Sequence, residues 1–293
     1  GNIYKKKDLL LCFQNNLMPT ISDVKECNIC NDIGKEYQNY FYVHLKVDTG
    51  MSRLGFDINN FLYSFHKIIS LQNIRIDGIY SHLATADAFN AKDKDSYANI
   101  QRRNFMKLLS DIGIKKYPNI TIHLANSAGA LLGEDFHFDM VRIGLSMYGY
   151  NPSSHVINLK LKPALFLKSK VSFIRMVDSN VGVSYGKNFI TSKKTKLAVI
   201  SIGYADGICR KLSNKISLIY KGQIYPQIGS ITMDQLMIDI TDSDEIKVGD
   251  TVMLLGSDGI NCISPLEWAE KASTIPWEVL CAFKNRLPRV QIE

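Results

Sequence analysis

Hydrophobic positions follow two different periods in the first half of the chain. Short runs rich in β-branched and aromatic residues alternate with longer segments in which apolar residues recur every three or four positions. These spacings are typical of strands and of amphipathic helices, respectively. The predicted helices include residues 56–71 and 104–113, and the predicted strands are Met18–Ile21, Tyr40–Val47, Ile74–His82, Ile120–Leu124 and Met140–Tyr148. The alternation predicts a parallel βαβ arrangement.

The second half of the chain has a different pattern. After about residue 158 it consists of short β-branched or alternating runs separated by glycine and aspartate, which predicts a β domain. Turn-forming residues at positions 151–154 mark a connection between the two parts. The expected fold class is therefore α/β plus β, with one domain over residues 1–155 and a C-terminal β domain over residues 156–293.

Charge and composition narrow the class of protein. The 293 residues carry a formal net charge of +7, but the lysines are scattered and no aromatic-basic signature is present, so we expect a small anionic ligand and no nucleic acid. No apolar run approaches the roughly 20 residues that span a bilayer, and no signal peptide is recognised, so we expect no membrane segment. The six cysteines are too few for a disulfide framework, which favours a reducing compartment. Cys27 and Cys30 have the spacing of a metal or redox pair, but two cysteines on one helix face is the favoured interpretation.

Polar side chains collect where the predicted strands end. Because right-handed crossovers make successive strands parallel, their carboxyl ends and the loops that follow lie on one face. The residues at these ends are Lys46, Asp48, Arg53, Ser81, His82, Asp87, His123, Asn126, Ser127, Arg142, Gly144 and Leu145. Together they predict a cradle for a phosphorylated, aromatic, anionic ligand. Taken singly, His123 reads as a core histidine, Ser127 as a helix N-cap and Arg142 as half of an internal ion pair.

A set of longer motifs carries a family resemblance. They are HLKVDTGMSRLGF, SHLATAD, HLANSAGAL, DMVRIGLSMYGY, GVSYG, SIGYADG, ITMDQLMIDI and IPWEVLCAFKNRLPR. Their order and approximate spacing resemble those of the alanine racemases over essentially the whole chain. The resemblance implies a pyridoxal 5′-phosphate (PLP) enzyme with an N-terminal (β/α)8 TIM-type barrel and a C-terminal β domain. It also implies a cytoplasmic head-to-tail homodimer in which the partner's β domain completes each active site. The implied reaction interconverts L-alanine and D-alanine through an external aldimine by a two-base mechanism and supplies D-alanine for peptidoglycan.

The resemblance assigns cofactor contacts to residues of the first domain. Arg53 resembles the arginine that binds the phenolic oxygen of PLP and helps to fix the substrate carboxylate. Arg142 resembles the arginine that faces the pyridine nitrogen and, because it keeps its proton, makes the cofactor a weaker electron sink. Ser127 and the backbone N–H groups of Gly144 and Leu145 resemble the phosphate cradle.

The remaining assignments concern proton transfer and the substrate. Tyr185 resembles the tyrosine that exchanges the Cα proton on one face, and His82 resembles the histidine that holds Arg142 and this tyrosine in register. The backbone N–H of Met233 matches a donor to the substrate carboxylate, and Tyr204 resembles a gate at the entrance. Lys46 occupies the position of a lysine that is carbamylated in some members.

Two departures from the family pattern qualify these expectations. Trp277 stands where the family usually has a tyrosine that contacts the phosphate, so one phosphate contact is in question. The lysine that binds PLP covalently belongs to a motif of the type VKANAYGHG, which no segment of this chain resembles. By the family pattern MPTIS falls near the fourth barrel strand, so the barrel is expected to be partial.

Several interpretations of the missing lysine remain open. A truncated record, a split protein and a decayed gene product each explain it. An inactive remnant or a dimerising module is therefore the alternative to an active racemase. A relative that acts on serine or lysine would share the chemistry and differ in pocket size.

Overall fold

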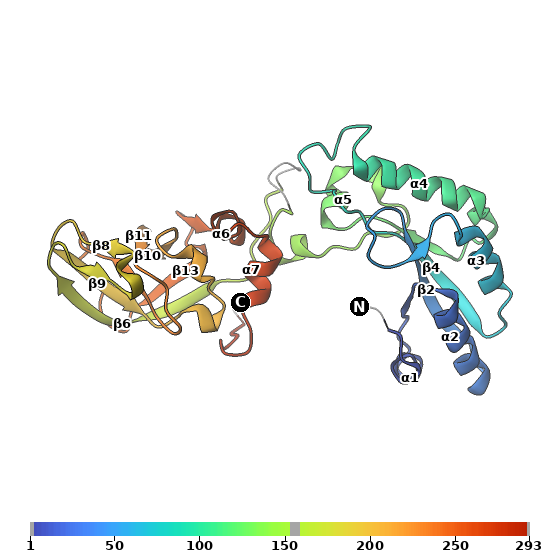
Figure 1. Cartoon of the computed structure of the whole chain (residues 1–293), viewed down its shortest axis with the longest axis horizontal. Helices are drawn as coiled ribbons and strands as arrows, with labels where there is room; N and C mark the ends of the chain where they lie inside the picture. The colour runs from blue at the N-terminus through green and yellow to red at the C-terminus, as the bar shows by residue number, and fades with distance from the viewer. Residues whose placement is uncertain (1–2, 153–158, 292–293) are drawn as a thin grey trace. The chain divides into compact units, whose positions relative to one another are not determined.

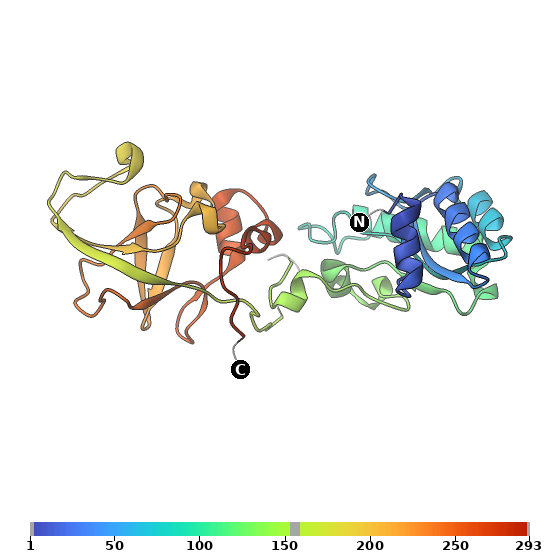
Figure 2. The ribbon, with the colours of Figure 1, turned by 90° about the horizontal axis from the view of Figure 1, so that it is seen from below.

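The computed structural model describes residues 3–152 and 159–291, which form two compact units. The N-terminal unit comprises Gly1–Met147 with Asn151–Leu161, and the C-terminal unit comprises Tyr148–Tyr150 with Lys162–Glu293. Figures 1 and 2 draw the N-terminal unit in blue to green and the C-terminal unit in yellow to red. The predicted domain boundary between residues 155 and 156 lies outside the described residues.

Parallel strands form the sheet of the N-terminal unit. The order is β1-β2-β4-β5, with β3 paired beside the end of β2, and every pairing is parallel. The strands are β1 Thr20–Ile21, β2 Phe41–Asp48, β3 Phe56–Asp57, β4 Ile74–Tyr80 and β5 Thr121–His123. The first four predicted strands are thus confirmed, each with somewhat different ends.

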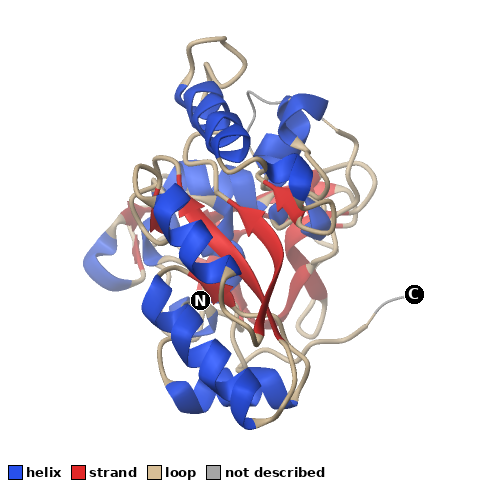
Figure 3. Ribbon diagram, turned by 90° about the vertical axis from the view of Figure 1, so that its right-hand side faces the viewer, coloured by secondary structure: helices blue, strands red, loops and turns tan. Residues whose placement is uncertain are grey.

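Helices pack against this sheet and bury its apolar side chains. They are α1 Lys6–Gln14, α2 Val24–Glu36, α3 Phe61–Ile69 and α4 Tyr97–Asp111. Figure 3, which looks onto this unit, shows long strands flanked by helices. Since side chains alternate along a strand, Val43, Leu45 and Val47 of β2 enter the hydrophobic core, whereas His44 and Lys46 occupy the other face. That second face carries the polar network described below.

The predicted strand Met140–Tyr148 is wrong for most of its length. Met140 makes a single parallel bridge to His123, and Leu145–Tyr148 is instead a 3₁₀ helix, η3. The chain leaves the sheet because the N–H of Met147 turns back to the carbonyl of Gly144 at 3.1 Å. The other short helices of this unit are η1 Ile114–Lys116, α5 Ser127–Leu132 and η2 Glu134–Phe136.

The C-terminal unit is an antiparallel β structure, as the sequence predicts. Its main sheet has the order β10-β11-β12-β9-β6-β13-β14, and a further pairing of β10 with β13 closes the sheet on itself. A closed sheet leaves fewer unpaired edges. The strands are β6 Leu167–Val177, β9 Thr195–Ile200, β10 Ser217–Tyr220, β11 Gln223–Ile228, β12 Leu236–Asp239, β13 Thr251–Ser257 and β14 Cys262–Ile263.

Smaller elements carry the candidate residues of the C-terminal unit. The hairpin of β7 (Gly182–Val183) and β8 (Phe189–Ile190) encloses the 3₁₀ helix η4, Tyr185–Lys187. The others are η5 Tyr204–Asp206, η6 Arg210–Leu212, α6 Pro265–Ala272 and α7 Pro276–Ala282. Ser264 caps α6 and Trp268 anchors it in the core.

Two further expectations can be compared with the fold. Cys27 and Cys30 both lie on the buried side of α2, which confirms the helix-face interpretation. Burial raises the pKa of Cys27 far above its ordinary value and that of Cys30 to about 12, so both thiols stay protonated at neutral pH. Within residues 3–152 and 159–291, no helix has the length and apolar character needed to cross a membrane.

Candidate active site

The turn that follows β2 is built around one carboxylate. Oδ1 of Asp48 accepts hydrogen bonds from the backbone N–H groups of Gly50, Met51 and Ser52 at 2.9, 2.8 and 3.1 Å. Burial raises the pKa of Asp48, but these three donors outweigh it and lower the pKa overall. The turn exposes Arg53, which makes no hydrogen bond or ion pair with another described residue. Its guanidinium is therefore available to an anion.

Lys46 is a buried amine beside this turn. Its side chain is 5% exposed, and its Nζ lies 5.9 Å from the centre of the Tyr80 ring. Burial lowers its pKa, and the positive charges of Arg53 and Arg142 lower it further, against an opposing effect of Asp48. The neutral amine is the form that carbon dioxide carbamylates, so carbamylation of this residue stays a prediction.

Arg142 is the centre of the polar network at the strand ends. Its Nη1 donates to Nδ1 of His123 at 2.7 Å. Its Nη2 lies within hydrogen-bond distance of the carbonyl oxygens of Ser81 and Leu124, at 2.9 and 3.1 Å, and of Nδ1 of His82 at 3.2 Å. These four partners are neutral, and no carboxylate of the described chain lies within ion-pair distance of this guanidinium. The alternative interpretation as half of an internal ion pair is therefore wrong for the described residues.

The two histidines that face Arg142 are held in the neutral form. Burial, assisted by nearby positive charge, lowers the pKa of His82 to about 4. Burial and the charge of Arg142 lower the pKa of His123 to about 3. A neutral imidazole has one nitrogen that accepts a hydrogen bond, and in both residues Nδ1 accepts from the guanidinium. His123 is thus more than a core histidine, because both of its ring nitrogens have polar partners.

Ser127 and the segment after Arg142 form a small cluster of donors and hydroxyl groups. The N–H of Gly144 donates to Oγ of Ser127 at 2.8 Å, and the N–H of Ser146 approaches the same oxygen at 3.4 Å. Oγ of Ser146 is buried and has no hydrogen-bond partner in the described chain. Leu145 is buried between them. The unpartnered Ser146 hydroxyl fits a phosphate oxygen, and the N–H of Gly144 could donate to another by exchanging the Ser127 hydroxyl for it.

Asn126, and not Ser127, caps helix α5. The side-chain oxygen of Asn126 accepts from the N–H of Gly129 at 2.9 Å. The interpretation of Ser127 as an N-cap is therefore wrong. Because the capping position is filled by its neighbour, the Ser127 hydroxyl is directed to Gly144 instead.

In the C-terminal unit, Tyr185 is held by its backbone. Its side chain is 72% exposed, and it begins η4 after Ser184, which has a positive φ of 64°. The Ser184 hydroxyl donates to the Ser230 carbonyl at 2.7 Å, and the Ser230 hydroxyl donates to the Tyr185 carbonyl at 2.8 Å. Asn188 adds a bond to Oγ of Ser230 at 2.8 Å. These contacts fix the loop while the phenol points to solvent.

Met233 and Tyr204 lie on two segments that are bound to each other. The N–H groups of Tyr204 and Ala205 donate to the carbonyls of Thr232 and Met233 at 2.9 and 3.0 Å. Gly203 permits this approach, since a Cβ there would lie 2.2 Å from the Thr232 carbonyl oxygen. The N–H of Met233 itself has no partner among the described residues. It is therefore free to donate to a carboxylate.

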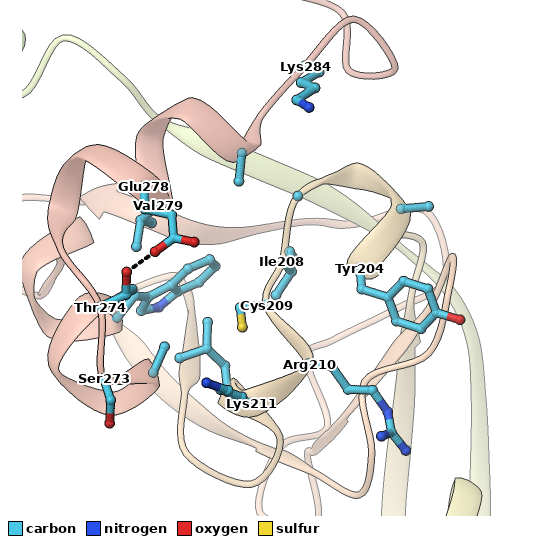
Figure 4. Close-up of a pocket in the computed structure, with 16 residues that line it drawn as sticks. Tyr204, Ile208, Cys209, Arg210, Lys211, Ser273, Thr274, Glu278, Val279 and Lys284 are labelled. Carbon is cyan, nitrogen blue, oxygen red and sulfur yellow. Dashed lines mark hydrogen bonds between the residues drawn. The ribbon is translucent and has the colours of Figure 1, made fainter.

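A pocket of about 480 Å³ lies beside Tyr204 within the same unit. Figure 4 shows Tyr204, Cys209 and Arg210 on one side and Thr274 and Glu278 on the other. The Thr274 hydroxyl and the Glu278 carboxylate are hydrogen-bonded across the base of α7. Of the residues predicted from the sequence, Tyr204 lines this pocket, whereas Trp277, half-buried on α7, does not.

Several residues that support the site from behind were not predicted from the sequence. The Tyr80 ring stacks on His123, with centroids 4.6 Å apart and planes 9° apart. Gln101, fully buried on α4, accepts from the N–H of Ala84 at 2.8 Å and donates to the His82 carbonyl at 3.0 Å. Tyr80 could have been found, because it lies two residues before His82 on the same predicted strand. Gln101 gives no such signal within its helix.

Comparison with family models and known sequences agrees with this geometry. The chain matches "Alanine racemase, N-terminal domain" over residues 1–152 and "Alanine racemase, C-terminal domain" over residues 164–291. It is 48% identical to the alanine racemase of Prochlorococcus marinus, in a match that covers 100% of this chain and 76% of that protein. It is 40% identical to the alanine racemase of Synechocystis, over 100% of this chain and 78% of that protein.

Solved structures give the same result. The alanine racemase of Clostridium difficile superimposes with a TM-score of 0.85 at 34% identity, covering 97% of this chain and 73% of that one. The alanine racemase of Bartonella henselae, described with covalently bound pyridoxal phosphate, gives a TM-score of 0.84 at 30% identity, covering 100% of this chain and 77% of that one.

Proposed function

The chain belongs to the alanine racemase family, and from this premise we propose how its residues interconvert L-alanine and D-alanine. The protein is an isomerase that uses PLP. The relatives favour this function over the alternative of an inactive remnant or a dimerising module. We further propose that the D-alanine serves peptidoglycan and that the enzyme works in the cytoplasm.

The residues of the N-terminal unit fit the cofactor. The orphaned hydroxyl of Ser146, together with Ser127 and the N–H of Gly144, suits a phosphate. The N–H of Leu145 would complete this cradle, as the family resemblance implies. Arg53, exposed and unpaired within the described chain, would bind the phenolic oxygen and the substrate carboxylate. When bound, PLP supplies an electron sink that acidifies the Cα–H bond of the substrate.

The network around Arg142 is the observation that carries this proposal. Its guanidinium is held by His123, His82 and two backbone carbonyls. Burial lowers the pKa of Arg142, but from so high an ordinary value that it remains a cation. Arg142 would therefore donate to the pyridine nitrogen and keep its own proton. A weaker electron sink favours rapid return of the proton to Cα, which suits racemisation.

Tyr185 would move the proton on one face of the substrate. The free N–H of Met233 would orient the substrate carboxylate, and Tyr204 would control access. Both belong to segments that are fastened to each other, so the orienting donor and the gate would move together.

A second proton carrier is needed on the opposite face of the substrate. The resemblance assigns this role, and covalent attachment of the cofactor, to the lysine of a VKANAYGHG-type motif, which residues 1–293 do not contain. The Prochlorococcus marinus relative extends beyond the shared stretch, which covers 76% of it. We therefore assign this role to no lysine of the present sequence.

Two other expectations stay predictions, namely the partial barrel and the effect of Trp277 on phosphate binding.

The proposal is tested by exchange of the α-proton. Protein expressed from its complete reading frame is loaded with PLP and incubated in D₂O with L-alanine or D-alanine. We expect the α-proton signal to disappear by NMR and the optical activity to decay to zero from either enantiomer. Retention of both signals would overturn the proposal.

Tyr185→Phe tests the role of the phenol. We expect exchange to fall about 10²- to 10⁴-fold, because a general acid-base group is lost, and to fall more from one enantiomer than from the other. Tyr225→Phe, in β11 of the same unit, is the matched control and should retain exchange. An equal loss from both enantiomers would contradict a role on one face only.

We also propose a homodimer with shared active sites. If the N-terminal unit of one subunit meets the C-terminal unit of its partner, Arg53→Ala and Tyr185→Phe subunits should complement each other. Random mixing gives half heterodimers, each with one intact site of two, so we expect about a quarter of the wild-type activity. No recovery in a mixture that sediments as a dimer would place both residues of a site in one subunit.

A further inference from the structure

A series of polar side chains connects Asp77, on β4 of the N-terminal sheet, to Arg142 through hydrogen bonds. Oδ2 of Asp77 on β4 lies 3.3 Å from Nε2 of His44 on β2. Nδ1 of His44 lies 3.0 Å from Nε2 of His123 on β5. Nδ1 of His123 accepts from Nη1 of Arg142 at 2.7 Å. The side chains of Asp77, His44, His123 and Arg142, which come from β4, β2, β5 and the segment after Met140, thus form a continuous hydrogen-bonded chain.

The direction of every bond in this chain follows from Arg142. A guanidinium only donates, so Nδ1 of His123 must carry a lone pair and Nε2 its proton. That proton faces Nδ1 of His44, which must then accept, leaving the proton of His44 on Nε2. Nε2–H of His44 points to the carboxylate of Asp77, which accepts. The chain therefore has a single self-consistent arrangement of protons.

We propose that Asp77 and His44 are positioning residues that act through His123 to hold Arg142 in its working orientation. The importance of this orientation rests on the proposed function. Without an acceptor at position 44, the buried Nε2–H of His123 would be unpaired, at a cost that favours rotation of the ring or transfer of its proton to Nδ1. Either change removes the acceptor that holds Nη1 of Arg142. The influence of Asp77 therefore reaches the cofactor side through two imidazole rings.

The backbone is shaped to permit this chain. The register between β2 and β4 shifts so that Val43 pairs with Ile76 and His44 pairs with Gly78, which leaves Asp77 as the extra residue of a β-bulge. A bulge re-aims side chains, and here it directs Asp77 toward His44.

Gly78 provides the space for the imidazole. A Cβ at this position would lie 2.5 Å from both Nδ1 and Cε1 of His44, closer than real Cβ contacts, so any side chain at position 78 would displace the ring. The stacked ring of Tyr80, two residues further along β4, then covers His123. The bulge, the glycine and the stacked ring are three features of one strand that serve the same chain of bonds.

The network also favours a neutral His123. Its pKa is lowered to about 3 by burial, Arg142 and His44. A protonated imidazole would have no lone pair for Nη1 of Arg142. The tautomer is therefore defined at any pH at which the enzyme would work.

The primary test reads the tautomers directly and needs neither cofactor nor activity. Protein labelled with ¹⁵N-histidine is examined at pH 7.5 by long-range ¹H–¹⁵N correlation, which distinguishes the two neutral tautomers and the imidazolium. We expect His44 and His123 both as the Nε2–H form. His66, exposed on α3, provides an assignment control through His66→Asn, which should leave both signals in place. An Nδ1–H form or an imidazolium at either residue would overturn the proposal.

A pair of substitutions separates positioning from packing. Asn at position 44 can present its amide oxygen near the place of Nδ1 and still accept from His123, whereas Leu cannot. We expect His44→Leu to lower kcat about 10-fold with little change in KM, and His44→Asn to recover most of the loss. Equal activity of the two variants would overturn the proposal. If the wild-type tautomers are as expected but no preparation racemises alanine, the proposed function fails while the hydrogen-bonded chain stands.

Discussion

The two units hold their candidate residues in different ways. In the N-terminal unit Arg142 has four neutral partners, so both the position and the direction of its guanidinium are fixed by the fold. In the C-terminal unit Tyr185 is 72% exposed, and only its backbone is fastened, through Ser184 and Ser230. If the proposed roles are correct, the N-terminal unit holds the charge of Arg142 rigidly, while the C-terminal unit presents the Tyr185 phenol from a fixed loop. A group that moves protons needs access, whereas a group that tunes a cofactor needs immobility.

The largest effect on stability should come from removing the Arg142 side chain in the N-terminal unit. Arg142→Ala leaves His123, His82 and two carbonyls without their donor, and we expect the free energy of unfolding of the N-terminal unit to fall by about 3 kcal/mol. Arg53→Ala is the matched control, because Arg53 is exposed and unpaired in the described chain, and should change it by less than about 0.5 kcal/mol. Urea denaturation of both variants makes the measurement. Similar losses would mean that the network around Arg142 has no special weight.

The next largest effect should come from acid, which we expect to lower the stability of the N-terminal unit more than that of the C-terminal unit. The folded state keeps His82 and His123 neutral, with pKa values lowered to about 4 and about 3, whereas in the unfolded chain they titrate near 6.5. Protons therefore bind the unfolded state first, so the stabilising contribution is complete above about pH 6.5 and is lost progressively as the pH falls toward 4. Asp48, whose pKa is lowered from 3.8, titrates below this window.

Hydrogen exchange locates this acid effect. Protection factors, corrected for intrinsic exchange, should fall in β4 and β5 between pH 7 and pH 5 while those of β9 and β12 stay nearly constant. An equal loss in both units would contradict a cause that is confined to the two histidines.

The smallest effect should come from loosening the loop that carries Tyr185 in the C-terminal unit. Ser230→Ala removes the donor to the Tyr185 carbonyl and the acceptor of Asn188, and we expect a loss of about 1 kcal/mol in stability. Because the loop carries Tyr185, kcat should fall several-fold while PLP affinity is unchanged. Ser257→Ala, which removes a comparable bond to the Asn261 carbonyl in the β13–β14 hairpin, is the control for stability alone. A matching fall in kcat in the control would exclude a specific role for Ser230.

Among the polar residues of the N-terminal unit, the sequence predicted Arg142, His82 and Ser127, but not the residues behind them that hold Arg142 in place. Arg142, His82 and Ser127 were found because parallel strands bring their carboxyl ends together, and the structure places Arg142 in contact with His82 and with the neighbouring His123. Their roles toward the cofactor stay predictions. Met140–Tyr148 was predicted as a strand from its apolar residues alone, and the turn at Gly144 that ends it depends on contacts with Ser127.

His44 and Asp77 were not predicted because their contact depends on the register between strands β2 and β4. His44 shares a face with Lys46 by simple alternation, so that position could have been proposed. Asp77 could not, because a bulge changes the alternation and leaves no mark in the local composition. In the C-terminal unit, Tyr185 was predicted only from the family resemblance, because a tyrosine in a turn does not by itself indicate a function.

Gly78 bears on how a mutational scan of this protein should be interpreted. In a saturation library selected for growth, replacements at position 78 should be depleted about as strongly as His44→Leu, although glycine carries no functional side chain. A scoring scheme that equates intolerance with burial would class it as a folding position. Measuring the abundance of each variant separately from its activity should show soluble protein whose activity is reduced about as much as that of His44→Leu, which is the signature of a residue that leaves space for its neighbour.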